Sequence, residues 1–202
     1  MQSLVGISNG PSLGTNIPAN REFGNFDGAE FLLGTVGYDF GKQLGVKQAV
    51  LAGNDGYNQP DENNSFTRNL EHVGSISFSF DTGKWGFRTE LAAGVGYLGQ
   101  KDLWGAMVMP FYNITDKLQA VARYTHLGSD GNNGIRLAHY ESDAVTGRGN
   151  RYDDGYLGLN YYFYGHKLKV QTGVQYAEMQ DDARDGGEYR GWEWITGLRI
   201  SW

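Results

Sequence analysis

Basic side chains recur at one of two alternating positions in several segments of this sequence. The five are Lys47, Arg88, Arg123, Lys169 and Arg199. Their immediate neighbours are mostly apolar, so in an extended chain the basic and apolar residues fall on opposite faces. Fixed Arg and Lys charges around a space raise the local concentration of anions and offset part of their dehydration cost. If the five side chains line one space, we expect it to attract small anions.

Acidic residues also fall on the predicted polar faces, at Asp39, Glu90 and Glu193. The polar faces still lean basic, although the whole chain carries a formal net charge of -6. We include Glu90 with the five cations as a candidate lining residue. A purely structural role stays equally open for each of them, because Arg88 and Glu90 could pair across the wall and stiffen it.

Two acidic segments, residues 54–62 and 181–188, carry the oxygen ligands that Ca²⁺ takes. Neither has the spacing of an EF-hand, so we favour solvated surface loops and assign no metal site. The run Gly94-Val-Gly-Tyr-Leu-Gly99 matches the letters of a dinucleotide-binding motif. That motif needs a following helix to receive the pyrophosphate, and none is predicted here. We therefore expect no cofactor.

The composition favours β-structure. The 202 residues include Gly 31, Tyr 13, Phe 10 and Trp 5, and the absence of cysteine excludes disulfides and zinc-thiolate sites. No apolar stretch approaches the ~20 residues of a spanning helix, whereas a barrel strand needs only about 9–11 residues with alternate ones apolar. A net charge of -6 argues against a nucleic-acid partner, which would require a basic surface.

The clearest two-residue period runs from Trp85 to Tyr97. One face carries Trp85, Phe87, Thr89, Leu91, Ala93, Val95 and Tyr97. The other face holds only Gly, Ala and the charged residues Arg88 and Glu90. The first face suits lipid and the second suits water or close packing. Aromatic residues at both ends of the apolar face are typical of interfacial girdles in a membrane barrel.

Short and long links alternate between such segments. The short links are residues 41–43, 81–84, 115–117 and 165–167. The long links, rich in Gly, Asn and Asp, are residues 54–69, 128–152 and 180–191, with a briefer one at 98–102. Tight turns at one end and long loops at the other predict an antiparallel up-and-down transmembrane β-barrel, with the turns on the periplasmic side.

Nine segments read as strands, and a further one at Ser3–Ser8 gives about ten. We treat residues 1–202 as a single domain, in which residues 1–29 carry the weakest pattern. The strand at 103–113 has two competing apolar faces, so we leave its register open. One face holds Trp104, Ala106 and Val108, and the other holds Met107, Met109 and Phe111.

The C-terminal segment alternates apolar residues and stops on an aromatic residue. Trp192, Trp194, Leu198, Ile200 and Trp202 share one face. It is similar to the last strand of outer-membrane barrel proteins, which the barrel assembly machinery reads as a signal. We therefore expect that machinery and membrane lipid as partners. The predicted interfacial anchors are Trp85, Tyr97, Trp194 and Trp202.

Residues 156–176, 189–192 and 197–202 together resemble the C-terminal end of the phosphate-selective porin O and P family. The resemblance implies an anion-selective, phosphate-passing porin, a homotrimer and the outer membrane of Gram-negative bacteria. Members of that family have more strands, so we expect a fragment of a larger barrel or a shortened member. No segment of this chain matches the part of the family that supplies its phosphate-binding residues.

These observations predict a passive pore for small anions or other small hydrophilic solutes, without catalytic residues. Two alternatives stay open. The long loop at 128–152 would suit a structural or adhesive barrel without a pore. A barrel enzyme would need a nucleophile or acid beside a base. The candidate bases are His72, His126, His139 and His166. No serine lies in a G-x-S-x-G elbow, so we expect no enzyme.

Overall fold

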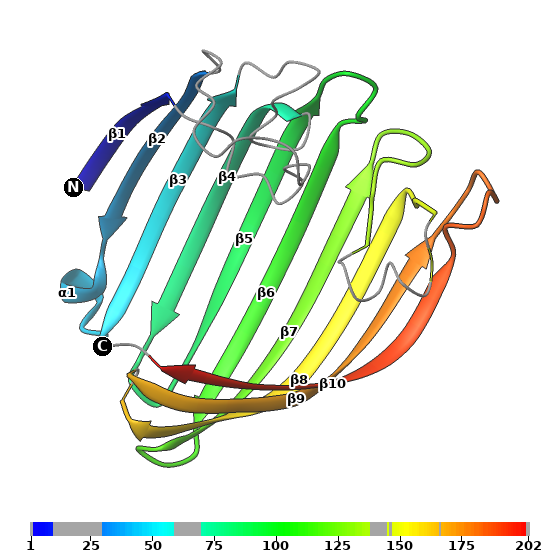
Figure 1. The fold of residues 1–202 in the computed structure, drawn as a ribbon. Helices are drawn as coiled ribbons and strands as arrows, with labels where there is room; N and C mark the ends of the chain where they lie inside the picture. The colour runs from blue at the N-terminus through cyan, green and yellow to red at the C-terminus, as the bar shows by residue number, and fades with distance from the viewer. Residues whose placement is uncertain are drawn as a thin grey trace.

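The computed structural model describes residues 2–9, 30–58, 70–137, 145, 147–165 and 167–200. Ten antiparallel strands form one sheet in chain order. They are β1 (Gln2–Asn9), β2 (Glu30–Asp39), β3 (Gln48–Asn58), β4 (Leu70–Asp81), β5 (Trp85–Gly96), β6 (Leu103–Asn113), β7 (Leu118–Ser129), β8 (Arg151–Tyr164), β9 (Leu168–Gln180) and β10 (Tyr189–Ile200). The predicted all-β up-and-down order is confirmed, including the first strand (Figure 1).

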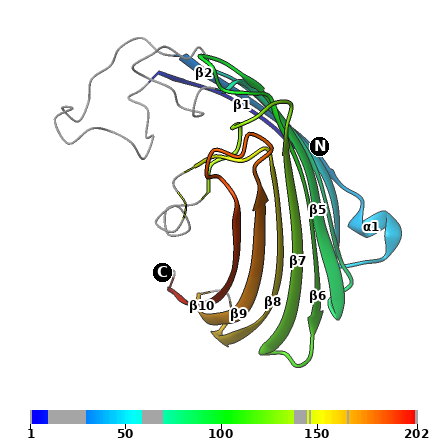
Figure 2. The same cartoon turned by 90° about the vertical axis from the view of Figure 1, so that its right-hand side faces the viewer.

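The sheet is curved and open. Strands β8, β9 and β10 bend round a hollow that also faces the middle strands (Figures 1 and 2). Within the described residues β1 and β10 are the two edges of the sheet and do not pair with each other. The described strands therefore form an open part of a barrel wall rather than a closed ring.

The two faces differ as the period predicts. Large apolar side chains lie exposed on the convex face, among them Val36, Leu51, Ile76, Leu91, Val108, Leu157 and Leu198. Strand register aligns them across the sheet: Leu91 lies opposite Ile76 on β4 and Ala106 on β6. The concave face carries the polar and small residues. Arg88, for example, lies opposite Ser79 and Met109.

The register of β6 is settled by its neighbours. Trp104 lies opposite Ala93, which places Trp104, Ala106 and Val108 on the convex face. Met107, Met109 and Phe111 therefore face the hollow. A Cβ atom on Gly86 would come within 2.5 Å of the Phe111 ring, so this ring needs the bare glycine beside it. That packing is a tertiary contact that the period alone could not predict.

The short links are confirmed at what we call the turn end of the sheet. Residues 41–43 belong to a single helical turn, α1 (Gly41–Leu44), which Gly45 closes with a left-handed φ of 67°. The opposite, or loop, end differs from prediction, because strands extend into all three predicted long loops. Asp55, for instance, pairs with Gly74 inside β3 and β4. Cross-strand hydrogen bonds stabilise these Gly- and Asp-rich stretches despite their loop-like composition.

A small apolar core lies on the concave face at the loop end. Ile135 and Leu137, from the loop between β7 and β8, pack against Tyr152, Ala177 and Met179. Ile135 also bridges to Gly149, which closes the loop on itself. The loop therefore folds into the hollow, as Figure 2 shows. No helix of the described residues is long and apolar enough to cross a membrane.

Candidate functional site: a basic cavity at the turn end

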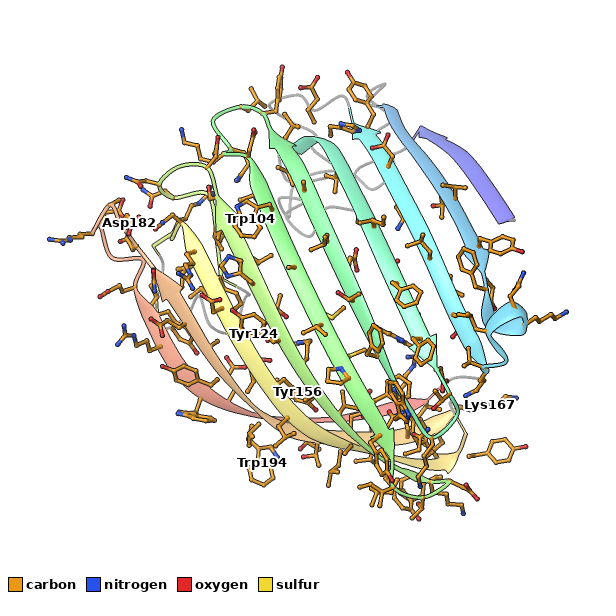
Figure 3. All side chains as sticks on the ribbon, turned by 180° about the vertical axis from the view of Figure 1, so that it is seen from behind. Trp104, Tyr124, Tyr156, Lys167, Asp182 and Trp194 are labelled. Atoms are coloured by element: carbon orange, nitrogen blue, oxygen red, sulfur yellow. The ribbon has the colours of Figure 1, made fainter. Side chains whose placement is uncertain are left out.

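A cavity of about 1240 Å³ lies in the hollow at the turn end. Its basic lining residues are Lys47, Lys84, Arg88, Lys117, Arg123, Lys169 and Arg199, and its acidic ones are Asp81 and Asp116. All five predicted cations therefore share one space. Side chains gather densely there, near Lys167 in Figure 3. The cavity is strongly basic within an acidic protein.

Glu90 does not line the cavity. It stands two residues beyond Arg88 on the concave face, opposite Ser77 and Met107. No ion pair joins Glu90 to Arg88 in the described part of the chain. The pairing that we kept open for these two residues is therefore absent there, and Arg88 presents its charge to the cavity.

Lys169 and Arg199 form the most concentrated positive charge. They are register partners on β9 and β10, so their side chains lie side by side on the concave face. Lys169 is only 9% exposed, and its ammonium lies 5.9 Å from the centre of the Tyr162 ring. Neither cation forms an ion pair with a carboxylate of the described residues. A buried, unpaired cation is costly, so this site favours an anion from outside.

Lys47 and Arg123 differ from these two because both are already paired. The Lys47 ammonium lies 2.9 Å from the Asp81 carboxylate in a partly exposed pair. Arg123 donates to Asp154 at 3.1 Å and to Gln175 at 3.0 Å. Its remaining buried Nε has no partner. Pairing reduces the positive charge that each offers to a solute.

An amide ladder crosses the concave face beside the cations. Asn160 donates to Gln119 at 2.9 Å and accepts from Gln171 at 2.9 Å. Gln119 donates in turn to Asn113, also at 2.9 Å. We did not predict this ladder. Its only sequence signal is that each residue takes an inward position of its strand, and its pairing requires the register.

Tyr156 lies on the same face of β8 as Asn160 of the ladder, four residues nearer the loop end. Cβ atoms on Gly158 or Gly173 would approach the Tyr156 side chain to 2.1 Å and 2.6 Å, so both positions need glycine. The Arg123 guanidinium lies 5.7 Å from the centre of the Tyr156 ring. Tyr156 lines the cavity and is labelled in Figure 3.

Comparison with known proteins gives no match. No family model matches the chain, and neither a curated protein nor a solved structure does. The resemblance of the C-terminal part to a porin family therefore stays a prediction.

The predicted anchors take different positions. Trp85 is the first residue of β5 and Tyr97 follows its last residue, and both side chains are exposed. Trp194 is exposed on the convex face but in the middle of β10, opposite Val174. Its indole N–H lies 3.1 Å from the hydroxyl oxygen of Thr172. A position at mid-strand does not fit a girdle. Trp202 lies outside the described residues.

Within the described residues, His72 and His126 do not form a catalytic group. His126 lies 2.7 Å from Asp153 on the convex face, and Asp153 also accepts from Tyr124 at 2.5 Å. His72 pairs with Asp55 at 2.5 Å. Within the described residues, no serine or threonine hydroxyl bonds to either ring. His139 and His166 lie outside the described residues.

The acidic segment 181–188 uses its first carboxylate internally. Asp181 accepts backbone N–H groups from Arg184, Asp185, Gly186 and Gly187 at 2.8–3.1 Å. These donors, Gly187 first, hold the pKa of Asp181 below its ordinary value. The described residues contain no group of three or more carboxylates or imidazoles arranged to hold a metal ion. The carboxylate organises the loop.

Proposed function

We propose that this chain forms the wall of an outer-membrane pore through which small anions diffuse passively. One observation carries the proposal: Arg88, Lys169 and Arg199 line a single cavity without a carboxylate partner. Such a cavity attracts anions by its potential and substitutes for part of their hydration. The structural alternative for these three residues would require ion-pair partners. None of the three forms an ion pair within the described residues, although Asp81 lines the same cavity.

The convex face supports a position in the membrane. Tyr124, Tyr176 and Trp192 lie in one cross-strand row. The next row toward the loop end is charged and contains His126, Asp153, Glu178 and Arg190. Toward the turn end the rows are mainly apolar, with Thr172 and Thr196 as a hydrogen-bonded polar pair among them. An aromatic row between an apolar band and charge is typical of the boundary between hydrocarbon and headgroups.

The inward-folded loop supports a limited passage at the other end. Its core of Ile135 and Leu137 covers inward positions of β8 and β9. Asn133 and Asn150 tie it to the neighbouring loop through Asp185 at 2.6 Å and Asp182 at 2.9 Å. A loop held in this way would narrow the mouth while the basic cavity selects by charge.

The open edges imply further pairing in the membrane. Unpaired backbone groups in lipid cost several kcal/mol each, so β1 and β10 need partner strands there. We propose that the strands of a larger barrel supply them, assembled through the C-terminal strand by the barrel assembly machinery. A homotrimer in the outer membrane of Gram-negative bacteria, and phosphate as one of the anions, are proposed from the family resemblance alone.

The test is ion current through the refolded chain in a planar bilayer under a salt gradient. We expect discrete conductance steps and a reversal potential that indicates anion preference. Cation preference, or no current from a chain whose circular dichroism shows folded β-structure, would contradict the proposal. The second result would favour a structural barrel, for which the filled loop end is the supporting observation.

A further inference from the structure

We infer that the turn-end cavity binds small polyhydroxylated organic anions, such as sugar phosphates or sugar acids, more tightly than bare inorganic anions. The inference rests on the proposed function in that the same cavity would carry the solute. The substrate class follows from the amide side chains that lie beside the cations.

The charged end of the binding site is the pair Lys169 and Arg199. Their side chains share one cross-strand row, and Tyr162 completes it on β8. Arg88 lines the same cavity from β5. A phosphate or carboxylate group there meets donors that no carboxylate of the described residues occupies. This end alone would accept any small anion.

The neighbouring row adds chemistry that a bare anion does not use. Gln171 stands two residues from Lys169 on the same face, and its register partners are Asn160 and Gly197. Residues two apart on a strand are separated by about 6–7 Å, close to the span from the phosphate of a sugar phosphate to its ring hydroxyls. The amide row is therefore placed to meet the body of a solute whose charged group lies on Lys169.

The ladder retains hydrogen-bonding capacity at Gln171. Each amide has two N–H donors, and within the ladder Gln171 uses one, to Asn160. Asn160 itself is only 7% exposed, and the Gln119 oxygen already accepts from Asn160 and Tyr162. No atom lies within 4 Å of a Cβ built on Gly197, so the position beside Gln171 is open space. Hydroxyl groups, which both donate and accept, suit such a surface better than an apolar or an ionic group does.

The experiment measures binding by calorimetry to the full chain folded in detergent micelles. The probes are glucose 6-phosphate, inorganic phosphate, phenyl phosphate and glucose. We expect glucose 6-phosphate to bind about tenfold tighter than inorganic or phenyl phosphate, as one or two additional hydrogen bonds would give, and glucose to bind weakest. Equal affinity for inorganic or phenyl phosphate in the unaltered chain would overturn the inference without any variant.

Three variants sharpen the result. Gln171→Leu should lower the affinity for glucose 6-phosphate to that for inorganic phosphate and leave the latter unchanged. Lys169→Gln should weaken both. Lys42→Gln, which removes a charge from exposed α1 outside the cavity, should change neither.

The two proposals fail in different ways. Phosphate binding that depends on Lys169 but is indifferent to the sugar would overturn the inference and leave the anion pore standing. Lack of binding by any phosphate, together with no anion preference in the bilayer, would overturn the pore itself.

Discussion

The two ends of the concave face of β7 to β10 share the same strands and the same two-residue period, yet one end holds an apolar core and the other a basic cavity. At the loop end the inward residues Tyr152, Ala177 and Met179 are apolar and a loop covers them. At the turn end the inward residues Lys169 and Arg199 are charged and line a cavity. Where the inward residues are apolar, a loop packs on that part of the wall. Where they are charged, that part stays accessible to solutes.

Detaching the loop between β7 and β8 from the apolar core should have the largest effect on the protein. Met179 is 1% exposed and lies at the centre of the apolar core, so Met179→Ala should lower the free energy of unfolding by about 2–5 kcal/mol. Urea titration of the refolded chain measures this change. We also expect a larger single-channel conductance as the loop detaches. Arg136→Ala, an exposed change on the same loop, is the control, and an equal effect of both variants would contradict the assignment of the core.

Reversing charge at the open end should alter selectivity rather than stability. Lys169→Glu should lower the anion-to-cation permeability ratio by roughly five- to tenfold, because two units of charge change in a confined space. Lys47→Glu should lower it less, since Asp81 already neutralises Lys47. Reversal potentials check both. A larger effect at Lys47 would mean that pairing does not determine which cations act on the solute.

The loop that Asp181 organises should respond to acid. Its pKa is lowered in the folded protein, so its contribution to loop stability is full above the ordinary Asp pKa of about 3.9 and is lost as pH falls through the lowered value. Asp181→Asn should remove this dependence. Amide hydrogen exchange at Gly186 and Gly187 measures it. Unchanged exchange in the variant would show that other contacts hold the loop.

The smallest effect is expected at Glu90. Because this carboxylate does not line the cavity, Glu90→Gln should shift the reversal potential far less than Lys169→Gln does. A comparable shift would extend the selective region beyond the cavity, toward the middle of the wall.

The strand pattern was predictable wherever one face is apolar and the other is not, as at residues 85–97. It failed to set the register of β6, where Met109 and Val108 compete, because the face of each residue depends on its cross-strand partner, such as Ala93 opposite Trp104. Loop lengths were overestimated because residues such as Asp55 take their hydrogen bonds from a neighbouring strand. Composition shows a residue's preference, whereas pairing depends on a partner that is distant in the sequence.

The same limit applies to the site. The cavity contains all five cations, and the inward positions of four of them followed from the period. Lys47 precedes the first residue of β3 and lies at the cavity through its ion pair with Asp81, which the period did not predict. The period did not show which of these cations are neutralised by a carboxylate. Arg123 and Asp154 are 31 positions apart in the sequence and meet only through the register of β7 and β8. The amide ladder spans four strands, so it too could not be predicted without the strand register.

The even number of strands has a consequence for how such a wall can grow. Gln2 of β1 pairs near the turn end of β2, and Ile200 of β10 pairs with Leu168 at the turn end of β9. The start of β1 and the end of β10 therefore both lie at the turn end of the sheet. A whole hairpin can therefore be added between β1 and β10 without reversing the direction of the strands already present. Barrels of different circumference can evolve by duplication of a hairpin in this way.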